Sequence, residues 1–199
     1  MHKELNKYIP QQSVKLVNNL VELYPFKLTI KNKRKTKHGD FKTSLNGIYK
    51  ISINNDLNKY RFLITFIHEI AHLATYKKYG NTKPHGLLWK QTFKYLMLPF
   101  LTDKIFPPDV LSPLANYLIK PKARTDADLI LSLALRNYDV LTNKKLIFEL
   151  KSGALFEHNN RIFKKGVKRR VRYECTEIKT LKKYLFQQNA EVVELEKQL

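Results

Sequence analysis

The chain has 199 residues, of which 43% are hydrophobic; this is enough for a domain with a hydrophobic core and excludes a chain that is disordered by composition. No apolar run approaches the roughly 20 residues that a membrane helix needs, no apolar leader segment follows the N-terminus, and a single cysteine excludes an internal disulfide. The net charge of +20 suits contact with phosphate backbones but is also typical of any lysine-rich surface. We therefore expect a cytoplasmic protein without a membrane partner, and charge alone leaves nucleic-acid binding open.

The N-terminal part of the chain is predicted to form one helix and then two strands. Residues 13–24 have apolar positions at helical spacing, with Ser13 as the N-cap. Phe26 to Ile30 alternates as a half-buried strand does, and Gly47 to Asn54 alternates in the same way after an Asn46-Gly47 turn. The basic segment between the two strands is predicted to be a loop.

A long apolar helix follows these strands. Asn58 is a good N-cap and Gly80 a good C-cap, so the helix is predicted to end near Tyr79. Its apolar residues lie on nearly every face, which is typical of a helix at the centre of a fold. Capping and proline signals predict three further helices: Gly86 to Leu98, Ser112 to Ile119 and Asp126 to Arg136.

The character of the sequence changes near residues 140–145. From Leu146 onward, turn signals separate short predicted strands, at 146–150, 161–163, 170–175 and 183–186. We therefore predict an α+β chain with two parts. Residues 1–143 form a core with an N-terminal helix, a small sheet and further helices, and residues 144–199 form a small, basic, all-β tail.

The segment His68-Glu69-Ile70-Ala71-His72 lies inside the predicted buried helix. Residues four apart share one helical face, so His68 and His72 can bind one metal ion, and neutral imidazole is a ligand that suits zinc. Glu69 can then accept a proton from a water molecule that zinc has made more acidic. Such short motifs also arise by chance, but two histidines and a glutamate are costly on an apolar helix unless they have a task.

A catalytic zinc site usually has three protein ligands and one open position. His85 is the favoured third ligand, because it follows the helix end at Gly80 closely enough for the chain to turn back to the metal. A lone histidine in a loop is more often a solvated surface residue. The sequence also offers other, less favoured ligands: His2, His38, His158, Asp103 and Asp109.

Four aromatic residues near this motif are not assigned a catalytic role. Trp89 and Phe93 are expected to pack in the core beside His85, with the wall of a substrate pocket as the alternative. Tyr76 and Tyr79 lie on the metal helix, but nothing in the sequence selects either as the group that stabilises an oxyanion.

These residues resemble the pattern of the SprT-like family of zinc metalloproteases. In that pattern, HExxH is followed by a short variable loop and then by His-Gly with an aromatic residue three positions on, as in Pro84-His85-Gly86-Leu87-Leu88-Trp89. The similarity extends over much of the chain, because further segments resemble SprT-like proteins, including bacterial ones: Lys31 to Asp40, Ile51 to Asn54, Asp56 to Asn58, Ser112 to Asp139 and Phe156 to Phe186.

The resemblance implies a zincin-like metalloprotease core with one Zn2+ per chain, held by His68, His72 and His85, and with Glu69 as general base. It also implies that a protein or peptide substrate pairs with an edge strand before the metal helix, here formed by Ile51, Ser52, Ile53 and Asn54. A eukaryotic member of the family cleaves proteins crosslinked to DNA and uses DNA as an activator, so DNA is a candidate second partner.

Many SprT-like proteins carry a C-terminal zinc ribbon with paired cysteines, whereas this ribbon-like tail has Cys175 alone. We therefore expect the tail to be held by packing of Leu155, Phe156, Phe163, Tyr173, Tyr184 and Phe186. Basic residues interleaved with these aromatics form either a solvated strand face or a nucleic-acid site: Lys164, Lys165, Lys168, Arg169, Arg170 and Arg172. The alternatives to a peptidase are thus a nucleic-acid-binding protein with a structural or inactive zinc site and, less favoured, a metallohydrolase that acts on something other than peptides.

Overall fold

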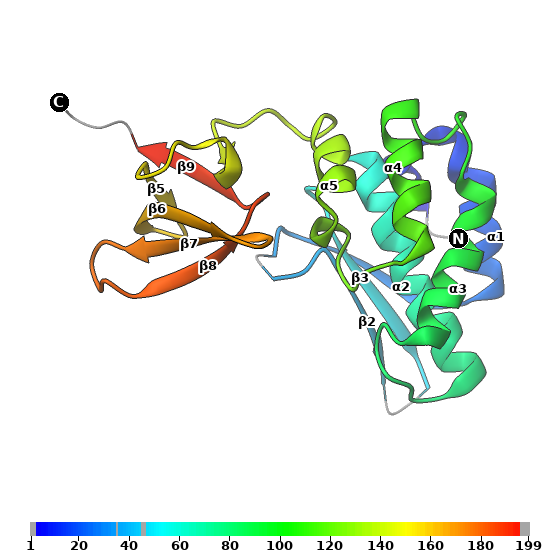
Figure 1. The fold of residues 1–199 in the computed structure, drawn as a ribbon. Coiled ribbons are helices and arrows are strands. Elements are labelled where there is room, and N and C mark those ends of the chain that lie inside the picture. The colour runs from blue at the N-terminus through cyan, green and yellow to red at the C-terminus, as the bar shows by residue number, and fades with distance from the viewer. Residues whose placement is uncertain (1–2, 35, 45–46, 196–199) are drawn as a thin grey trace. The chain divides into compact units, whose positions relative to one another are not determined.

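The computed structural model describes residues 3–34, 36–44 and 47–195 and divides the chain into two compact units, Met1–Asp139 and Val140–Leu199 (Figure 1). The boundary expected from the sequence, between residues 143 and 144, lies slightly later. Each unit has its own cluster of buried apolar side chains, so each is described by itself. Asn46, half of the predicted Asn46-Gly47 turn, lies outside the described residues.

The N-terminal unit combines helices with a small sheet. Its helical elements are η1 (Lys3–Lys7), η2 (Gln11–Ser13), α1 (Val14–Leu23), α2 (Lys59–Tyr79), α3 (Leu87–Met97), η3 (Leu98–Phe100), α4 (Pro108–Ile119), η4 (Thr125–Ala127) and α5 (Leu129–Arg136), where η marks a 3-10 helix. Its strands are β1 (Lys27–Lys31), β2 (Gly39–Thr43) and β3 (Tyr49–Asn54).

The sheet of this unit has the strand order β1-β3-β2. β1 runs parallel to β3 and β2 runs antiparallel to it, so that Leu28 and Phe41 both lie opposite Ile51. The expectation that Ile51 to Asn54 form an edge strand is therefore wrong, because β3 is hydrogen-bonded to a strand on each side. The edge strand that contacts α2 is β2, although the sequence predicted a basic loop there.

Helix α2 is the central element of the unit and contacts β2, β3 and α3 (Figure 1). Asn58 caps its start, because the side-chain oxygen accepts hydrogen bonds from the backbone N–H groups of Tyr60 (3.1 Å) and Arg61 (2.9 Å). Gly80 ends it with a left-handed φ of 70°, which glycine adopts without strain. Both predicted ends are confirmed, and the aliphatic and phenylalanine side chains between them are buried.

Two later helices begin at other residues than those predicted. α4 begins at Pro108, about one turn before Ser112, and accommodates Pro113 inside the helix. α5 begins after Asp128, whose side chain accepts a hydrogen bond from the Leu131 N–H (3.2 Å). The segment between the two helices therefore contains the short η4 turn, which becomes part of the site wall described below.

The C-terminal unit is a single antiparallel sheet with the order β4-β9-β5-β6-β7-β8. Its elements are β4 (Lys145–Leu146), η5 (Ile147–Glu149), β5 (Leu155–His158), β6 (Arg161–Arg169), β7 (Arg172–Glu177), β8 (Lys183–Gln187) and β9 (Glu191–Leu195). The predicted strand at 146–150 is wrong for most of its length, because η5 follows β4 at once. β5 and β9 were not predicted.

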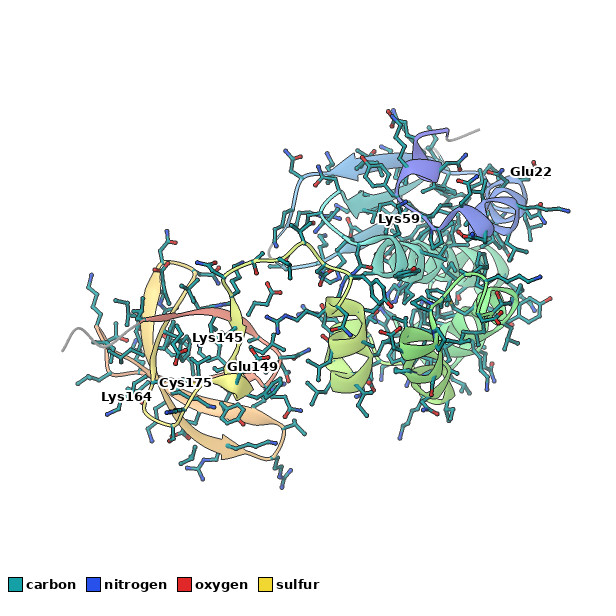
Figure 2. All side chains as sticks on the ribbon, turned by 90° about the horizontal axis from the view of Figure 1, so that it is seen from above. Glu22, Lys59, Lys145, Glu149, Lys164 and Cys175 are labelled. Carbon is teal, nitrogen blue, oxygen red and sulfur yellow. The ribbon has the colours of Figure 1, made fainter. Side chains whose placement is uncertain are left out.

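Packing of apolar side chains holds this unit together, as expected for a tail without paired cysteines. Phe156 and Phe163 belong to its buried cluster, and Tyr173, Tyr184 and Phe186 pack against it. The free thiol of Cys175, labelled in Figure 2, is buried in the same cluster. Leu155 is half-buried and, against expectation, does not belong to this packing.

Lys165 does not face solvent, which corrects its assignment to a nucleic-acid site. The residue is 5% exposed, and its Nζ donates hydrogen bonds to the backbone carbonyls of Leu150 and Phe148. The ammonium also lies 4.3 Å from the centre of the Tyr173 ring, a cation–π contact. The other basic residues proposed for that site are exposed: Lys164, Lys168, Arg169, Arg170 and Arg172.

The chain is therefore α+β, as predicted, and among the residues that the structure describes the helices belong to the first unit apart from the single turn η5. None of the helices within the described ranges combines the length and the apolar character that crossing a bilayer requires.

Candidate metal centre

Helix α2 presents His68, Glu69 and His72 from its buried middle part. His68 and His72 are one helical turn apart, so their imidazoles lie on the same face. Glu69 projects beside them and is also buried. Since the helix is packed on the sheet and on α3, the three side chains start from a rigid backbone.

His85 comes from the loop between α2 and α3 and returns to the same place. Its φ of 57° lies in the left-handed region, which costs a residue with a Cβ roughly 1–2 kcal/mol. The Nε2 atom of His85 lies 3.1 Å from that of His68 and 3.0 Å from that of His72. A strained backbone that brings a third imidazole to two others is typical of a functional site.

The three Nε2 atoms form a triangle whose third side, between His68 and His72, is 3.2 Å. Hydrogen bonds among the rings cannot satisfy all three nitrogens, because donors and acceptors cannot alternate around a ring of three. Nitrogen ligands at about 2.0–2.1 Å from a tetrahedral zinc ion are roughly 3.3 Å apart. The triangle therefore has the size and the chemistry of a site for one such ion.

Burial keeps these imidazoles neutral, which is the form that binds a metal. Burial, aided by His72 and His85, lowers the pKa of His68 well below its ordinary value. Burial likewise lowers the pKa of His72 to about 4, with a smaller contribution from His85. The pKa of His85 is lowered by burial and then by the positive charge of Lys90. At neutral pH, protons therefore compete weakly with a metal ion for the three nitrogens.

Trp89 packs against all three imidazole rings. Its ring centre lies 4.5 Å from that of His68, 5.1 Å from that of His72 and 4.7 Å from that of His85. Trp89 is 1% exposed and stacks on Phe93, so both residues pack in the core beside the site as expected, and Trp89 also lines the cavity described below, which was the alternative. Within the described residues, the indole Nε1 has no hydrogen-bond partner. The single tryptophan of the chain is thus a direct spectroscopic reporter of this site.

The carboxylate of Glu69 lies against strand β2. It accepts a hydrogen bond from the backbone N–H of Phe41, and Gly39 leaves it room, since a Cβ at Gly39 would be 2.5 Å from Oε1. Burial, followed by the charge of Asp40, raises the pKa of Glu69 to about 8, against a lowering by Arg34. A carboxyl group whose pKa lies near the working pH is suited to accept and return a proton.

A cavity of about 500 Å3 lies over these residues, all of it within the N-terminal unit. Its walls are residues 36–41 leading into β2, the loop 80–85, and residues 123–126 around η4. Tyr76 lines the cavity, whereas Tyr79 is not among its lining residues. The volume is in the range of sites that hold a small molecule or a short piece of a larger substrate.

Two lining residues, His38 and Asp126, were not predicted to belong to the site. The Nε2 atom of His38 lies 3.4 Å from Oδ2 of Asp126, which also pairs with Arg61 of α2. His38 was considered only as a less favoured ligand, and in the described chain it is not part of the metal-ligand group. No sequence signal connects the two residues, because two strands, three α-helices and their loops separate them along the chain.

The substrate-binding residues predicted on β3 do not line this cavity: Ile51, Ser52, Ile53 and Asn54. Ile51, Ile53 and Asn54 are buried in the middle of the sheet. The neighbouring strand β2 contributes Gly39, Asp40 and Phe41 to the cavity instead.

The fold and the site define an α+β protein in which one buried helix and the loop after it supply three histidines that could hold a metal ion. The chain belongs to the SprT-like family, whose sequence model matches residues 3–102, about half of the chain. The matched part includes the three histidines and Glu69, and it confirms the resemblance over this part of the chain; the resembling segments Ser112 to Asp139 and Phe156 to Phe186 lie beyond the match. This family is associated with metallopeptidase function and typically with zinc. No solved structure matches the chain.

Proposed function

We propose that the chain is a zinc-dependent endopeptidase with a zincin-like N-terminal core. The observation that carries this proposal is the convergence of three neutral imidazoles, with Nε2 atoms 3.0–3.2 Å apart, beside a buried carboxyl group. His68, His72 and His85 would hold one Zn2+. The association of the SprT-like family with metallopeptidase function supports the same assignment.

Bound zinc would supply Lewis acidity, which lowers the pKa of a water molecule to about 7 and polarises a carbonyl group. Glu69 would accept a proton from the attacking water and later donate it to the amine that leaves the cleaved peptide bond. The Phe41 N–H would keep the carboxylate oriented during both transfers. Tyr76 lines the cavity, so of the two tyrosines considered it is the better placed to stabilise an oxyanion.

Strand β2 is the proposed docking site for the substrate backbone. Among the described residues it pairs with β3 on one side only, so its outer edge offers main-chain donors and acceptors to an extended peptide. An extended segment added there would pass over the cavity that holds Glu69. Addition of an extended substrate strand suits unfolded or locally unfolded protein segments. We propose DNA-associated or DNA-crosslinked proteins as the substrates.

The decisive experiment compares the wild type with Glu69→Gln. Both proteins should contain about one zinc ion per chain, because Glu69 is not a ligand. Cleavage of an unfolded protein such as casein, and of a DNA-bound protein with and without DNA, should fall by about 100-fold or more in the variant. Cleavage at the wild-type rate would remove Glu69 as the base, and full activity after complete removal of zinc would remove the metal from the mechanism.

A second function is favoured by the exposed cations of the C-terminal unit: Lys164, Lys168, Arg169, Arg170 and Arg172. This unit would bind single-stranded nucleic acid through phosphate contacts, either alongside peptidase activity or in its place. Affinity for an oligonucleotide should then fall steeply between roughly 50 and 200 mM salt. An affinity that barely changes over this range would exclude the phosphate-contact interpretation.

A further inference from the structure

Arg34, in the segment between β1 and β2, connects that segment to the central strand β3. Its Nε donates a hydrogen bond to Oδ1 of Asn54 (2.7 Å), and its Nη1 donates to Oγ of Ser52 (3.0 Å). Its Nη2 donates to the backbone carbonyls of His38 and Ser52, at 3.3 Å each. The planar guanidinium can donate to these acceptors together, whereas a lysine ammonium has no such planar set of N–H donors.

Asn54 completes this connection from the side of β3. Its backbone N–H donates to the carbonyl of His38 (2.9 Å), and its Nδ2 donates to the carbonyl of Lys37 (3.0 Å). Asn54 is buried, so water does not readily replace these hydrogen bonds if one of them is lost. The backbone at Lys37 and His38 is therefore held on β3, immediately before β2 begins.

Gly39, the next residue, lies in contact with the proposed general base. A Cβ at this position would be 2.5 Å from Oε1 and 2.8 Å from Cγ of Glu69, and 2.8 Å from Cγ2 of Thr65. Two residues later, the Phe41 N–H donates its hydrogen bond to the same carboxylate. The backbone of β2 thus limits where the carboxylate of Glu69 can lie, on the side away from α2.

We propose that Arg34 is a positioning residue for Glu69: by fixing the backbone at Lys37 and His38, it holds Gly39 and Phe41 against the carboxylate. This inference rests on the proposed function, because the position of the Glu69 carboxylate affects the reaction rate only if Glu69 transfers a proton. A catalytic group must be held within about 0.5 Å of its productive position. A glutamate side chain has several rotatable bonds, so α2 alone does not provide that precision.

The first test measures steady-state kinetics and zinc content of Arg34→Ala, Gly39→Ala and the double variant. Lys33→Ala is the matched control, since Lys33 is the preceding residue and pairs with Asp56 at the surface (3.2 Å). We expect kcat to fall at least tenfold in Arg34→Ala and Gly39→Ala, with KM and zinc content within twofold of the wild type. The double variant should lose little more than the worse single variant, because both changes act through one carboxylate.

The second test does not depend on activity and measures amide hydrogen exchange in the zinc-loaded protein. In Arg34→Ala, the amides of Phe41 and Asn54 should exchange at least tenfold faster, while amides in the buried middle of α2 remain unchanged. If the wild type cleaves no protein, the proposed function fails, and the exchange still decides whether Arg34 holds this backbone. Unchanged exchange or an unchanged kcat in Arg34→Ala would overturn the inference. So would a loss of zinc in proportion to kcat, because Arg34 would then act on the metal site.

Discussion

The Nε2 atoms of His72 and His85 lie 3.0 Å apart, although one residue belongs to α2 and the other to the loop beyond that helix. Two neutral imidazoles at this distance can share a proton, but the third Nε2, from His68, lies within 3.2 Å of both and has no such partner left. A cation at the centre satisfies all three nitrogens. His85 is therefore placed to hold a metal ion as directly as the two histidines of the helix.

We expect His85→Asn to lose zinc and keep its fold. Asparagine tolerates the left-handed φ of 57° at this position, so the change removes the imidazole without adding backbone strain. Zinc affinity should fall by about 100-fold or more. Elemental analysis measures the content, and quenching of Trp89 fluorescence by Co2+ measures binding. Asn81→Ala, in the same loop, should bind as the wild type does, and an unchanged zinc content in His85→Asn would disprove the third ligand.

The stability of the zinc-free protein should depend on pH through Glu69. Burial raises its pKa from 4.5 to about 8, so between these values the folded chain keeps a proton that the unfolded chain has lost. Stability from this group is therefore full below about pH 4.5 and decreases as pH rises towards 8. Glu69→Gln lacks this titration. As pH rises from 5 to 8, the free energy of unfolding of the wild type should therefore fall by on the order of 3 kcal/mol relative to that of the variant.

Urea unfolding of the chelator-treated proteins at several pH values measures this difference. The three histidines titrate in both proteins, so their contribution cancels in the comparison. If the two proteins show parallel stability curves from pH 5 to 8, Glu69 is not a buried neutral acid in the metal-free state.

Arg61→Met should destabilise the N-terminal unit. Arg61 is 8% exposed at its side chain and pairs with Asp126 and with Asp139 (3.4 Å), so the change removes a buried cation that pairs with both carboxylates. Because both carboxylates are partly exposed, the loss of Arg61 should cost about 1–3 kcal/mol. Lys59→Met, at the exposed start of the same helix (Figure 2), should stay within about 0.5 kcal/mol of the wild type in urea unfolding. Equal effects of the two changes would contradict a structural role for Arg61.

Replacement of two neighbouring lysines of β6 should affect different properties, stability for one and nucleic-acid binding for the other. Lys165→Met leaves the carbonyl of Leu150 without its donor and should destabilise the C-terminal unit by about 1–3 kcal/mol in thermal unfolding. Lys164→Met, at an exposed position (Figure 2), should leave stability unchanged. If the unit binds nucleic acid, Lys164→Met should weaken binding and reduce its salt dependence, since a phosphate contact is lost. An equal loss of affinity in a folded Lys165→Met protein would show that the buried ammonium reaches the ligand.

Local signals predicted the elements whose ends depend on neighbouring residues. Asn58 and Gly80 mark the ends of α2 because capping involves only the first and last turns of a helix. Strand β2 was missed for the opposite reason. Gly39 to Thr43 has few residues with strong strand preference, and it is a strand because β3 lies beside it.

The sequence by itself determined that His68 and His72 share one helical face beside Glu69, because the helical repeat of 3.6 residues places such positions without knowledge of the rest of the fold. The identity of His85 followed from its place after Gly80 and from family resemblance. Only the tertiary structure decided that β2 is the edge strand beside Glu69, that His38 and Asp126 share its cavity, and that Lys165 is buried. Strand order and burial depend on contacts between residues far apart along the chain, which no local spacing records.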